Sequence, residues 1–310
     1  MTTVPRRRNV PPLPTARAAV GALAAGLVAA PAEATAQVRG PDDDGTAQVV
    51  LVTGSTGGLG REVARRLASN GAHVIVHGRN EERGAALVAE IEGEGVGSAR
   101  FYRADLGSFA EVRRLAAEIR RDYDRLDVLV NNAGIWLDAP ERQLSVDGHE
   151  LHFQVNYLSG FLLTRELLPL IVESAPARVV NVSSVAQRAI DFDDVMLASG
   201  YDDGRAYAQS KLAQIMFTFD LAEALQGRGV TAVAVHPASM MDTDMVLERG
   251  ARPRSSVDEG AAAVMQAITS PEVESGTYHR GLEPALANDQ AYDGEARARL
   301  RRLSERLTRS

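Results

Sequence analysis

Cysteine is absent from the 310-residue sequence. Its absence excludes disulfide bonds, thiolate nucleophiles and cysteine-ligated metal sites. The sequence also lacks a basic stripe of the kind that follows a nucleic-acid backbone, and its formal net charge is -7. This balance argues against nucleic acid as the main partner.

A long hydrophobic run is also missing from the first 45 residues, which we interpret as a leader. The apolar stretch at 18–30 is too short and too alanine-rich to predict a transmembrane helix, so no integral membrane association is expected. Three arginines at 6–8 precede it, and Ala-Thr-Ala at 34–36 follows it, as in an export signal. Two interpretations stay open: export through a twin-arginine-like signal in residues 1–36, or a disordered leader on a cytoplasmic protein.

The rest of the chain, residues 46–310, alternates predicted strands and helices without a repeat or a linker. Apolar runs that predict strands lie at 48–53, 73–77, 99–103, 126–130, 178–182, 230–236 and near Thr277. The first predicted helix follows a glycine-rich turn and runs to about residue 70. Further helical patterns lie at about 81–92, 108–121, 151–172, 206–226, 257–268 and 295–307, the last as a surface helix. Glycines at 71, 93 and 227 are expected to end three of these helices. This alternation predicts a single α/β domain with a parallel sheet covered by helices on both faces.

A glycine-rich turn connects the first predicted strand to the first helix. Gly54 permits a sharp turn, Gly58 permits close approach of a pyrophosphate, and Gly60 permits close packing of helix on strand. The helix N-terminus then offers free N–H groups to phosphates. A simple turn is the alternative, but the strand-turn-helix context favours dinucleotide binding. The turn residues predicted to contact the cofactor are Gly54, Ser55, Thr56, Gly58, Leu59 and Gly60.

The end of the second strand indicates which dinucleotide is bound. An NAD-specific site usually places an acidic residue there to accept from the ribose 2′-hydroxyl, yet no acid occurs before Glu81. Gly78 removes a side chain, and Arg79 can pair with a 2′-phosphate. We therefore expect NADP(H) to be preferred over NAD(H), with a solvated arginine at a helix start as the alternative.

Tyr207 and Lys211 lie one helical turn apart and therefore on one face of their predicted helix. Unperturbed tyrosine and lysine titrate at about 10 and about 10.4, too high for proton transfer at neutral pH. We expect the ammonium of Lys211 to lower the pKa of Tyr207, which then acts as general acid in reduction and general base in oxidation. Because this spacing is common by chance, an ordinary amphipathic helix is the alternative.

Three further motifs accompany this pair. Asn131-Asn132-Ala133-Gly134 follows the fourth predicted strand, Asn156 lies in the following helix, and Ser183-Ser184 ends the fifth strand. With the glycine turn and the Tyr–Lys pair, their order resembles the classical short-chain dehydrogenase/reductase family over residues 47–292. The long interval between Ser184 and Tyr207 resembles the retinol-dehydrogenase-like subgroup.

This resemblance implies a fold and a catalytic tetrad. The fold is a Rossmann-type, doubly wound parallel sheet of about seven strands in the order 3-2-1-4-5-6-7, in a chain that forms a homodimer or a tetramer. The tetrad is Asn156, Ser184, Tyr207 and Lys211. Ser184 would hold the substrate oxygen against Tyr207, Asn156 would support a water chain to Lys211, and Lys211 would bind the nicotinamide ribose.

The resemblance also implies cofactor contacts beyond the glycine turn. They are Asp105, Leu106, Asn132, Ala133, Gly134, Tyr207, Lys211, Pro237 and Thr243. The family usually has Pro-Gly where this chain has Pro237-Ala238, and Thr243 stands one residue later than usual. A backbone group is therefore the alternative to Thr243 as the carboxamide contact.

The substrate site is expected at the loops that follow the fourth, fifth and sixth strands. Residues 238–257 would form a lid over it. The candidate lining residues are Trp136, Ala186, Met240, Met241 and Met245, with packing of the methionines against the lid as the alternative. No metal is expected, since His149 and His152 have no third ligand placed by the sequence.

Together these features predict an NADP(H)-dependent oxidoreductase that interconverts a carbonyl and an alcohol on a small lipophilic molecule. A redox sensor that binds NADP(H) without turnover is one alternative, although such relatives usually lose the tyrosine or the lysine. An extended-branch epimerase or dehydratase is another. The glycine spacing and the short C-terminal region argue against it.

Overall fold

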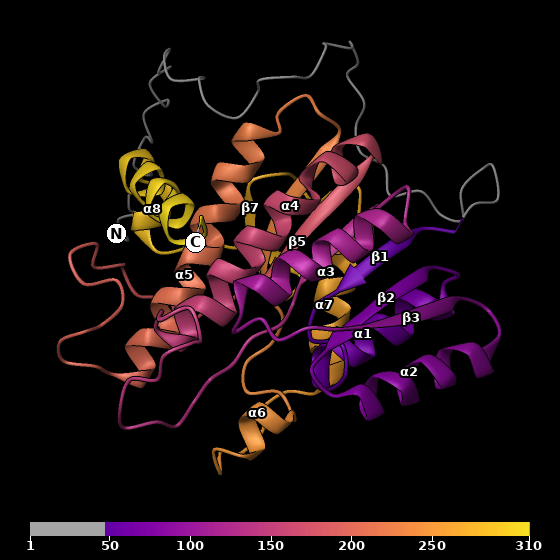
Figure 1. Cartoon of the computed structure of the whole chain (residues 1–310), viewed down its shortest axis with the longest axis horizontal. Coiled ribbons are helices and arrows are strands. Elements are labelled where there is room, and N and C mark those ends of the chain that lie inside the picture. The colour runs from indigo at the N-terminus through magenta and orange to yellow at the C-terminus, as the bar shows by residue number, and fades with distance from the viewer. Residues whose placement is uncertain (1–46, 310) are drawn as a thin grey trace, which may run out of the picture. The chain divides into compact units, whose positions relative to one another are not determined.

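A central β-sheet organises residues 47–309, the part of the chain that the computed structural model describes (Figure 1). Its strands are β1 (Val49–Val52), β2 (His73–Gly78), β3 (Ser98–Arg103), β4 (Val128–Asn131), β5 (Ala177–Val182), β6 (Val230–His236), β7 (Thr277–Arg280) and β8 (Glu283–Pro284). They are ordered β3-β2-β1-β4-β5-β6-β7-β8, and β1 to β7 pair in parallel. The predicted order is confirmed, and the short antiparallel β8 extends it by one strand.

Two layers of helices cover the sheet (Figure 1). Helices α1 (Gly58–Ser69), α2 (Glu81–Glu94) and α7 (Val257–Thr269) lie on one face, and α3 (Phe109–Asp122), α4 (Ser159–Glu173) and α5 (Asp203–Ala224) lie on the other. Successive strand residues alternate between the faces, so Val50 and Val52 pack toward α1 while Leu51 packs toward α3. Both faces are buried, which explains the continuous apolar runs in the strands.

Helix ends differ from the predictions where capping chemistry overrides the simple pattern. Gly95, rather than Gly93, ends α2, because Gly95 adopts the left-handed conformation at φ +71° that stops a helix. Helix α5 begins at Asp203, three residues before the predicted start. The Asp202 side chain accepts a hydrogen bond from the backbone N–H of Arg205 and so caps it.

The helix predicted at 151–172 contains an irregular turn. Residues Phe153–Leu158 form the π-helix η1, and α4 continues directly from it. Together, Phe153–Glu173 is long and apolar enough to cross a membrane. Its side chains are largely buried against the sheet and neighbouring helices, which accounts for that composition.

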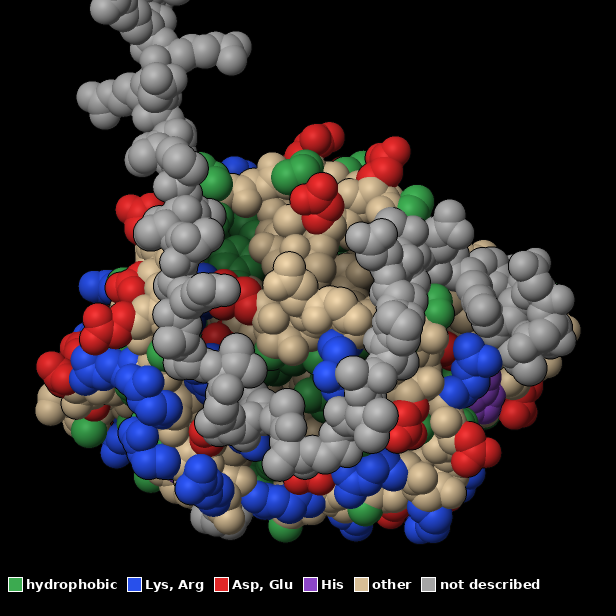
Figure 2. Space-filling view, turned by 90° about the horizontal axis from the view of Figure 1, so that it is seen from above, with side chains coloured by type: hydrophobic (Ala, Val, Ile, Leu, Met, Phe, Trp, Pro, Cys, Tyr) green, Lys and Arg blue, Asp and Glu red, His purple; other side chains and the backbone are tan. Residues whose placement is uncertain are grey.

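The C-terminal helix α8 (Gly294–Leu307) is more than the surface helix predicted from its arginines. Ala296, Leu300 and Ser304 are buried against the layer that contains α5, and the two helices lie side by side in Figure 1. Arg301 pairs with Asp220 of α5 at 2.6 Å. The face in Figure 2 shows basic side chains interspersed with acidic ones. The expected leader lies outside the described residues.

Candidate active site

Three glycines of the turn, at 54, 58 and 60, occupy positions that disfavour a side chain. Gly54 and Gly58 have φ values of +65° and +49°, which disfavour other residues. A Cβ on Gly60 would lie 2.4 Å from the carbonyl oxygen of Gly54 and 2.5 Å from Nδ2 of Asn132. The backbone therefore stays open along the start of α1, where N–H groups can bind phosphate.

Thr53 and Asn132 join this turn to the end of β4. The Asn132 side chain donates to the Thr53 carbonyl at 2.8 Å, and the backbone N–H groups of Asn132 and Ala133 donate to the Thr53 hydroxyl at 3.0 Å. Asn131 lies behind them and donates to Asn181 of β5 and to Thr164 of α4. The predicted Asn-Asn-Ala-Gly segment thus ties the turn, the sheet and α4 together.

The end of β2 carries an exposed cation. Among residues 47–309, Arg79 forms no ion pair, so its guanidinium can meet a ligand anion. Gly78 fits closely against Thr56 of the turn, since a Cβ on Gly78 would lie 2.5 Å from the Thr56 methyl group. Sequence reasoning missed Arg83, whose guanidinium lies 3.6 Å from where a Cβ of Gly57 would be and pairs with Asp244 at 3.1 Å.

His77, which lies in β2, is a second residue that sequence reasoning missed. Its Nδ1 accepts a hydrogen bond from the backbone N–H of Gly54 at 3.1 Å, which fixes the first glycine of the turn. Burial lowers the pKa of His77 to about 4, so the ring is neutral and can accept this bond at physiological pH.

The Asp105-Leu106 pair follows β3 at the same edge of the sheet. Asp105 accepts from the backbone N–H of Gly107 at 2.8 Å, and its own N–H donates to Glu111. Leu106 is buried in the core. The structure therefore gives this pair a local turn role, while the predicted adenine contact stays a prediction.

Asn156 lies in the middle of the π-helix η1. Its Oδ1 accepts from the backbone N–H of Ile135 at 2.7 Å, and its Nδ2 donates to the Ile135 carbonyl and to Ser210 of α5. A Cβ on Gly134 would lie 3.3 Å from Asn156 Oδ1 and 3.4 Å from the Lys211 ammonium nitrogen, so these two groups converge on Gly134. π-Helical turns are frequent at functional sites because they reorient side chains.

Tyr207, Ser184 and Lys211 come together across α5 and the end of β5. Burial raises the pKa of Tyr207, while a hydrogen bond with the Ser184 hydroxyl opposes that shift. Lys211 Nζ lies 5.7 Å from the centre of the Tyr207 ring and donates to the Val182 carbonyl at 3.0 Å. The expectation that the pKa of Tyr207 is lowered is therefore wrong for the protein alone, since desolvation outweighs the hydrogen bond with Ser184.

Burial also acts on Lys211 itself. The side chain is 4% exposed, and desolvation lowers its pKa to about 7. A lysine that titrates near neutral pH can hold or release a proton during turnover. Lys211 is also the only lysine in the chain.

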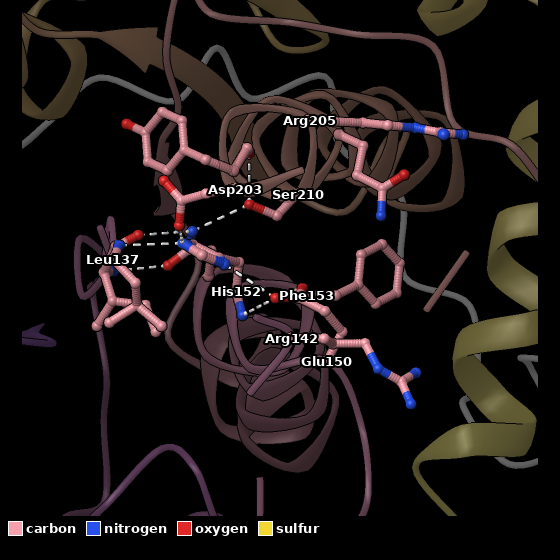
Figure 3. Close-up of polar contacts among 12 residues, drawn as sticks. Leu137, Arg142, Glu150, His152, Phe153, Asp203, Arg205 and Ser210 are labelled. Carbon is pink, nitrogen blue, oxygen red and sulfur yellow. Dashed lines mark hydrogen bonds and ion pairs between the residues drawn. The ribbon is translucent and has the colours of Figure 1, made fainter. Parts of the chain in front are cut away.

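The loop after β4 places an aromatic ring beside Tyr207. The Trp136 ring stacks on Tyr207 with centroids 5.0 Å apart and an interplanar angle of 23°. The next residue, Leu137, donates its backbone N–H to His152 Nε2 at 3.1 Å. His152 is fully buried, and its Nδ1 lies 2.9 Å from a carboxylate oxygen of Glu150. Figure 3 shows these two side chains together with Leu137. His152 thus holds the loop in place.

The segment after β6 approaches the glycine turn from the other side. A Cβ on Gly58 would lie 3.2 Å from the Thr243 methyl group, so Thr243 lies against the turn. Met241 packs against Gly260 of α7 and the core under α1, as in the packing alternative for the methionines. Of the other lining candidates, Ala186 is exposed beside Ser184, and Met240 has a left-handed backbone at φ +54°.

A family model for short chain dehydrogenases matches residues 48–253. The chain therefore belongs to the short-chain dehydrogenase family, and the predicted oxidoreductase class is confirmed at that level. Mouse retinol dehydrogenase 12 is 41% identical over 197 residues, which are 63% of this chain and 62% of that protein. Mouse polyprenol dehydrogenase is 36% identical over 94% of both chains.

The match thus spans less than two thirds of the length of the retinol dehydrogenases, and it confirms the predicted likeness to that subgroup. Among solved structures, the Pseudomonas aeruginosa RhlG complex with NADP has a TM-score of 0.63 at 29% identity, covering 79% of this chain and 96% of that one. A short-chain dehydrogenase from Burkholderia cenocepacia in complex with NADP has a TM-score of 0.61 at 29% identity, covering 75% and 95%.

Proposed function

We propose that the protein is an NADP(H)-dependent oxidoreductase that interconverts a carbonyl and an alcohol on a small lipophilic molecule. One observation carries the proposal. Asn156, Ser184 and the Tyr207–Lys211 pair come from three separate segments of the chain, yet Asn156 and Lys211 converge on Gly134 while Ser184 and Lys211 lie close to Tyr207. Within residues 47–309, the buried Lys211 has no acidic partner, and a helix with a purely structural role would not need such a lysine.

Tyr207 is the proton donor to the substrate oxygen in the reductive direction. The phenol is protonated at neutral pH, as a general acid must be, and the rise in pKa that burial causes has to be offset by a nearby positive charge for the proton to be transferred efficiently. Ser184 hydrogen-bonds with Tyr207 and can hold the substrate oxygen at the same place. When bound, NADP(H) supplies or accepts the hydride. Lys211, with its lowered pKa, supplies a charge beside the phenol that favours its ionisation in the oxidative direction.

The described residues fit a dinucleotide that carries an extra phosphate. The open backbone at Gly54 and Gly60 accommodates a pyrophosphate, and Arg79 offers an unpaired guanidinium at the end of β2. Arg83 lies nearby over Gly57. The solved complexes of related proteins with NADP support this choice of cofactor.

A lipophilic substrate is supported by two independent observations. Related proteins are named retinol dehydrogenase and polyprenol dehydrogenase, whose names refer to apolar alcohols. In this chain, the ring of Trp136 lies directly beside Tyr207. An aromatic ring offers a large apolar contact area to such a molecule.

Tyr207→Phe tests the catalytic assignment. Removing the phenolic proton should lower kcat for NADPH-dependent carbonyl reduction by at least about 10²-fold. Tyr292→Phe, which alters an exposed tyrosine in the 3₁₀-helix η2 (Asp289–Tyr292), is the matched control and should keep wild-type turnover. Wild-type turnover in Tyr207→Phe would contradict the proposal.

Arg79→Ala tests the cofactor assignment. Losing a charge-assisted contact to the 2′-phosphate should raise the KM for NADPH about tenfold and leave the KM for NADH unchanged. The measurement is the initial rate of absorbance change with each cofactor. An equal effect on both cofactors would show that Arg79 does not distinguish them.

A further inference from the structure

The segment after β6 reaches the candidate active site through one arginine. Residues 239–256, within the predicted lid at 238–257, leave the sheet and return to it. Two hydrogen bonds join the ends of this segment: the backbone N–H of Arg254 donates to the Met240 carbonyl, and the Ser255 hydroxyl donates to the Ser239 carbonyl. The short helix α6 (Asp244–Leu247) lies within this lid segment. Arg249 follows α6 and extends back toward the loop after β4.

Arg249 makes four contacts there. Its guanidinium lies over the Trp136 ring, 4.0 Å from the ring centre. It donates to the Leu137 carbonyl, and it lies 3.3 Å from Asp203 and 3.6 Å from Asp138. The side chains of Arg249 and Asp203 are only 19% and 15% exposed, so the ion pair between them is shielded from bulk water.

The ring of Trp136 joins Arg249 to the proposed proton donor in one stack. The guanidinium of Arg249 lies over the indole, and the ring of Tyr207 stacks on the same indole with centroids 5.0 Å apart. The loop that carries Trp136 is fixed on either side of the ring, by Asn156 at Ile135 and by His152 at Leu137. Arg249 is the contact that comes from the lid segment.

Asp203 connects this stack to α5. It is the first residue of the helix that carries Tyr207 and Lys211, and Figure 3 shows it together with Leu137 and His152. The ion pair between Arg249 and Asp203 therefore ties the lid segment directly to the helix that bears the proposed proton donor.

We propose that Arg249 is a positioning residue: by clamping Trp136 from the lid segment, it holds the Tyr207 ring in the orientation that proton transfer to the substrate requires. The inference rests on the proposed function of Tyr207. The lid segment would then do more than cover the substrate, because one of its residues also acts on the chemical step. The lid must be closed for the clamp to form, so the stack also couples closure to proton transfer.

Trp136 is the only tryptophan in the chain, which makes the clamp directly observable. Arg249→Met retains an unbranched apolar side chain but removes the cation and the hydrogen-bond donors. Acrylamide, a neutral quencher, should reach Trp136 more readily in this variant, giving a larger Stern–Volmer constant. The matched control is Arg252→Met, which removes an equal charge from an exposed position in the same segment.

Steady-state kinetics with NADPH and an apolar aldehyde give the second measurement. Arg249→Met should lower kcat about tenfold, which corresponds to the loss of a largely desolvated cation–π contact, while the KM for NADPH stays the same. Arg249→Lys keeps a cation for the indole and should recover part of the lost kcat. Arg252→Met should behave as wild type in both measurements.

Two results would overturn the inference. One is fluorescence quenching in Arg249→Met equal to that in Arg252→Met, which would mean that the clamp does not hold Trp136. The other is altered quenching with an unchanged kcat, which would mean that the clamp does not act on Tyr207. If Tyr207→Phe keeps full activity, the proposed function fails instead, and the quenching data still measure the contact between Arg249 and Trp136.

Discussion

Replacing Lys211 by methionine should stabilise the fold while abolishing the proposed activity. The lysine is 4% exposed and forms no ion pair within residues 47–309, and its ammonium donates to the Val182 carbonyl alone. A buried charge without a partner destabilises the native state. Methionine has a similar length and needs no hydrogen bond, so it fits the same space without that cost.

The size of the effect follows from the pKa of Lys211, which burial lowers from 10.5 to about 7. At about 1.4 kcal/mol per pKa unit, keeping the charged form buried costs about 5 kcal/mol. The substitution leaves the Val182 carbonyl without its donor, which costs about 1–3 kcal/mol. We therefore expect a net gain of about 2–4 kcal/mol in the free energy of unfolding at pH 6.

The dependence on pH has a definite sign. Below pH 7 the lysine is protonated in both states, so the wild type carries the full burial cost. Between pH 7 and 10.5 the unfolded chain binds a proton that the native state does not, so the stability of the wild type rises with pH. The advantage of Lys211→Met should thus be largest at pH 6 and smaller at pH 9.

Urea unfolding followed by far-UV circular dichroism at pH 6, 7.5 and 9 measures this difference. Tyr207→Phe, one helical turn away, removes no charge and serves as the control, with a difference from wild type that does not vary over this range. A Lys211→Met variant that is less stable at pH 6, or whose advantage is independent of pH, would refute the reasoning.

Three further predictions follow from single contacts. Gly60→Ala would place a Cβ 2.4 Å from the Gly54 carbonyl oxygen. NADPH binding, measured by cofactor fluorescence, should therefore be lost, and the free energy of unfolding should fall by about 1–3 kcal/mol. Unchanged binding would show that the turn can relax. Tyr157→Phe removes a 2.7 Å hydrogen bond to Ser304 and should cost about 1 kcal/mol in urea unfolding, whereas no loss would mean that packing alone holds α8. Lys211 is the only lysine in the sequence, so an amine-reactive reagent should inactivate the enzyme by modifying this one side chain. Mass spectrometry identifies the modified residue, and bound NADPH should protect Lys211 from the reagent. Inactivation without modification of Lys211 would contradict this prediction.

The sheet and the positions of the motif residues could be predicted from the sequence because they depend on local patterns. Buried strands read as continuous apolar runs, and Gly54 and Gly60 have no tolerated substitutes at their positions. Strand order came from the family resemblance, since the β-α alternation alone fixes only parallel pairing and crossover hand.

The parts of the site that the sequence could not predict depend on contacts between distant segments. No local pattern around Arg249 indicates that its side chain lies over Trp136, which is 113 residues earlier in the chain. The π-helix around Asn156 has no signature in periodicity, because its apolar spacing resembles that of an α-helix. The pKa of Tyr207 was predicted with the wrong sign, because the depth of burial is a tertiary property.

The position of α8 has a consequence for how the protein is made. Tyr157 and Phe161, which belong to the helix that carries Asn156, are covered in part by Leu300 and Ser304 of α8. A chain leaves the ribosome from its N-terminus, so these aromatic rings lack this cover until residues 294–307 have been made. A nascent chain stalled before residue 294 would therefore expose apolar surface on the helix that carries Asn156.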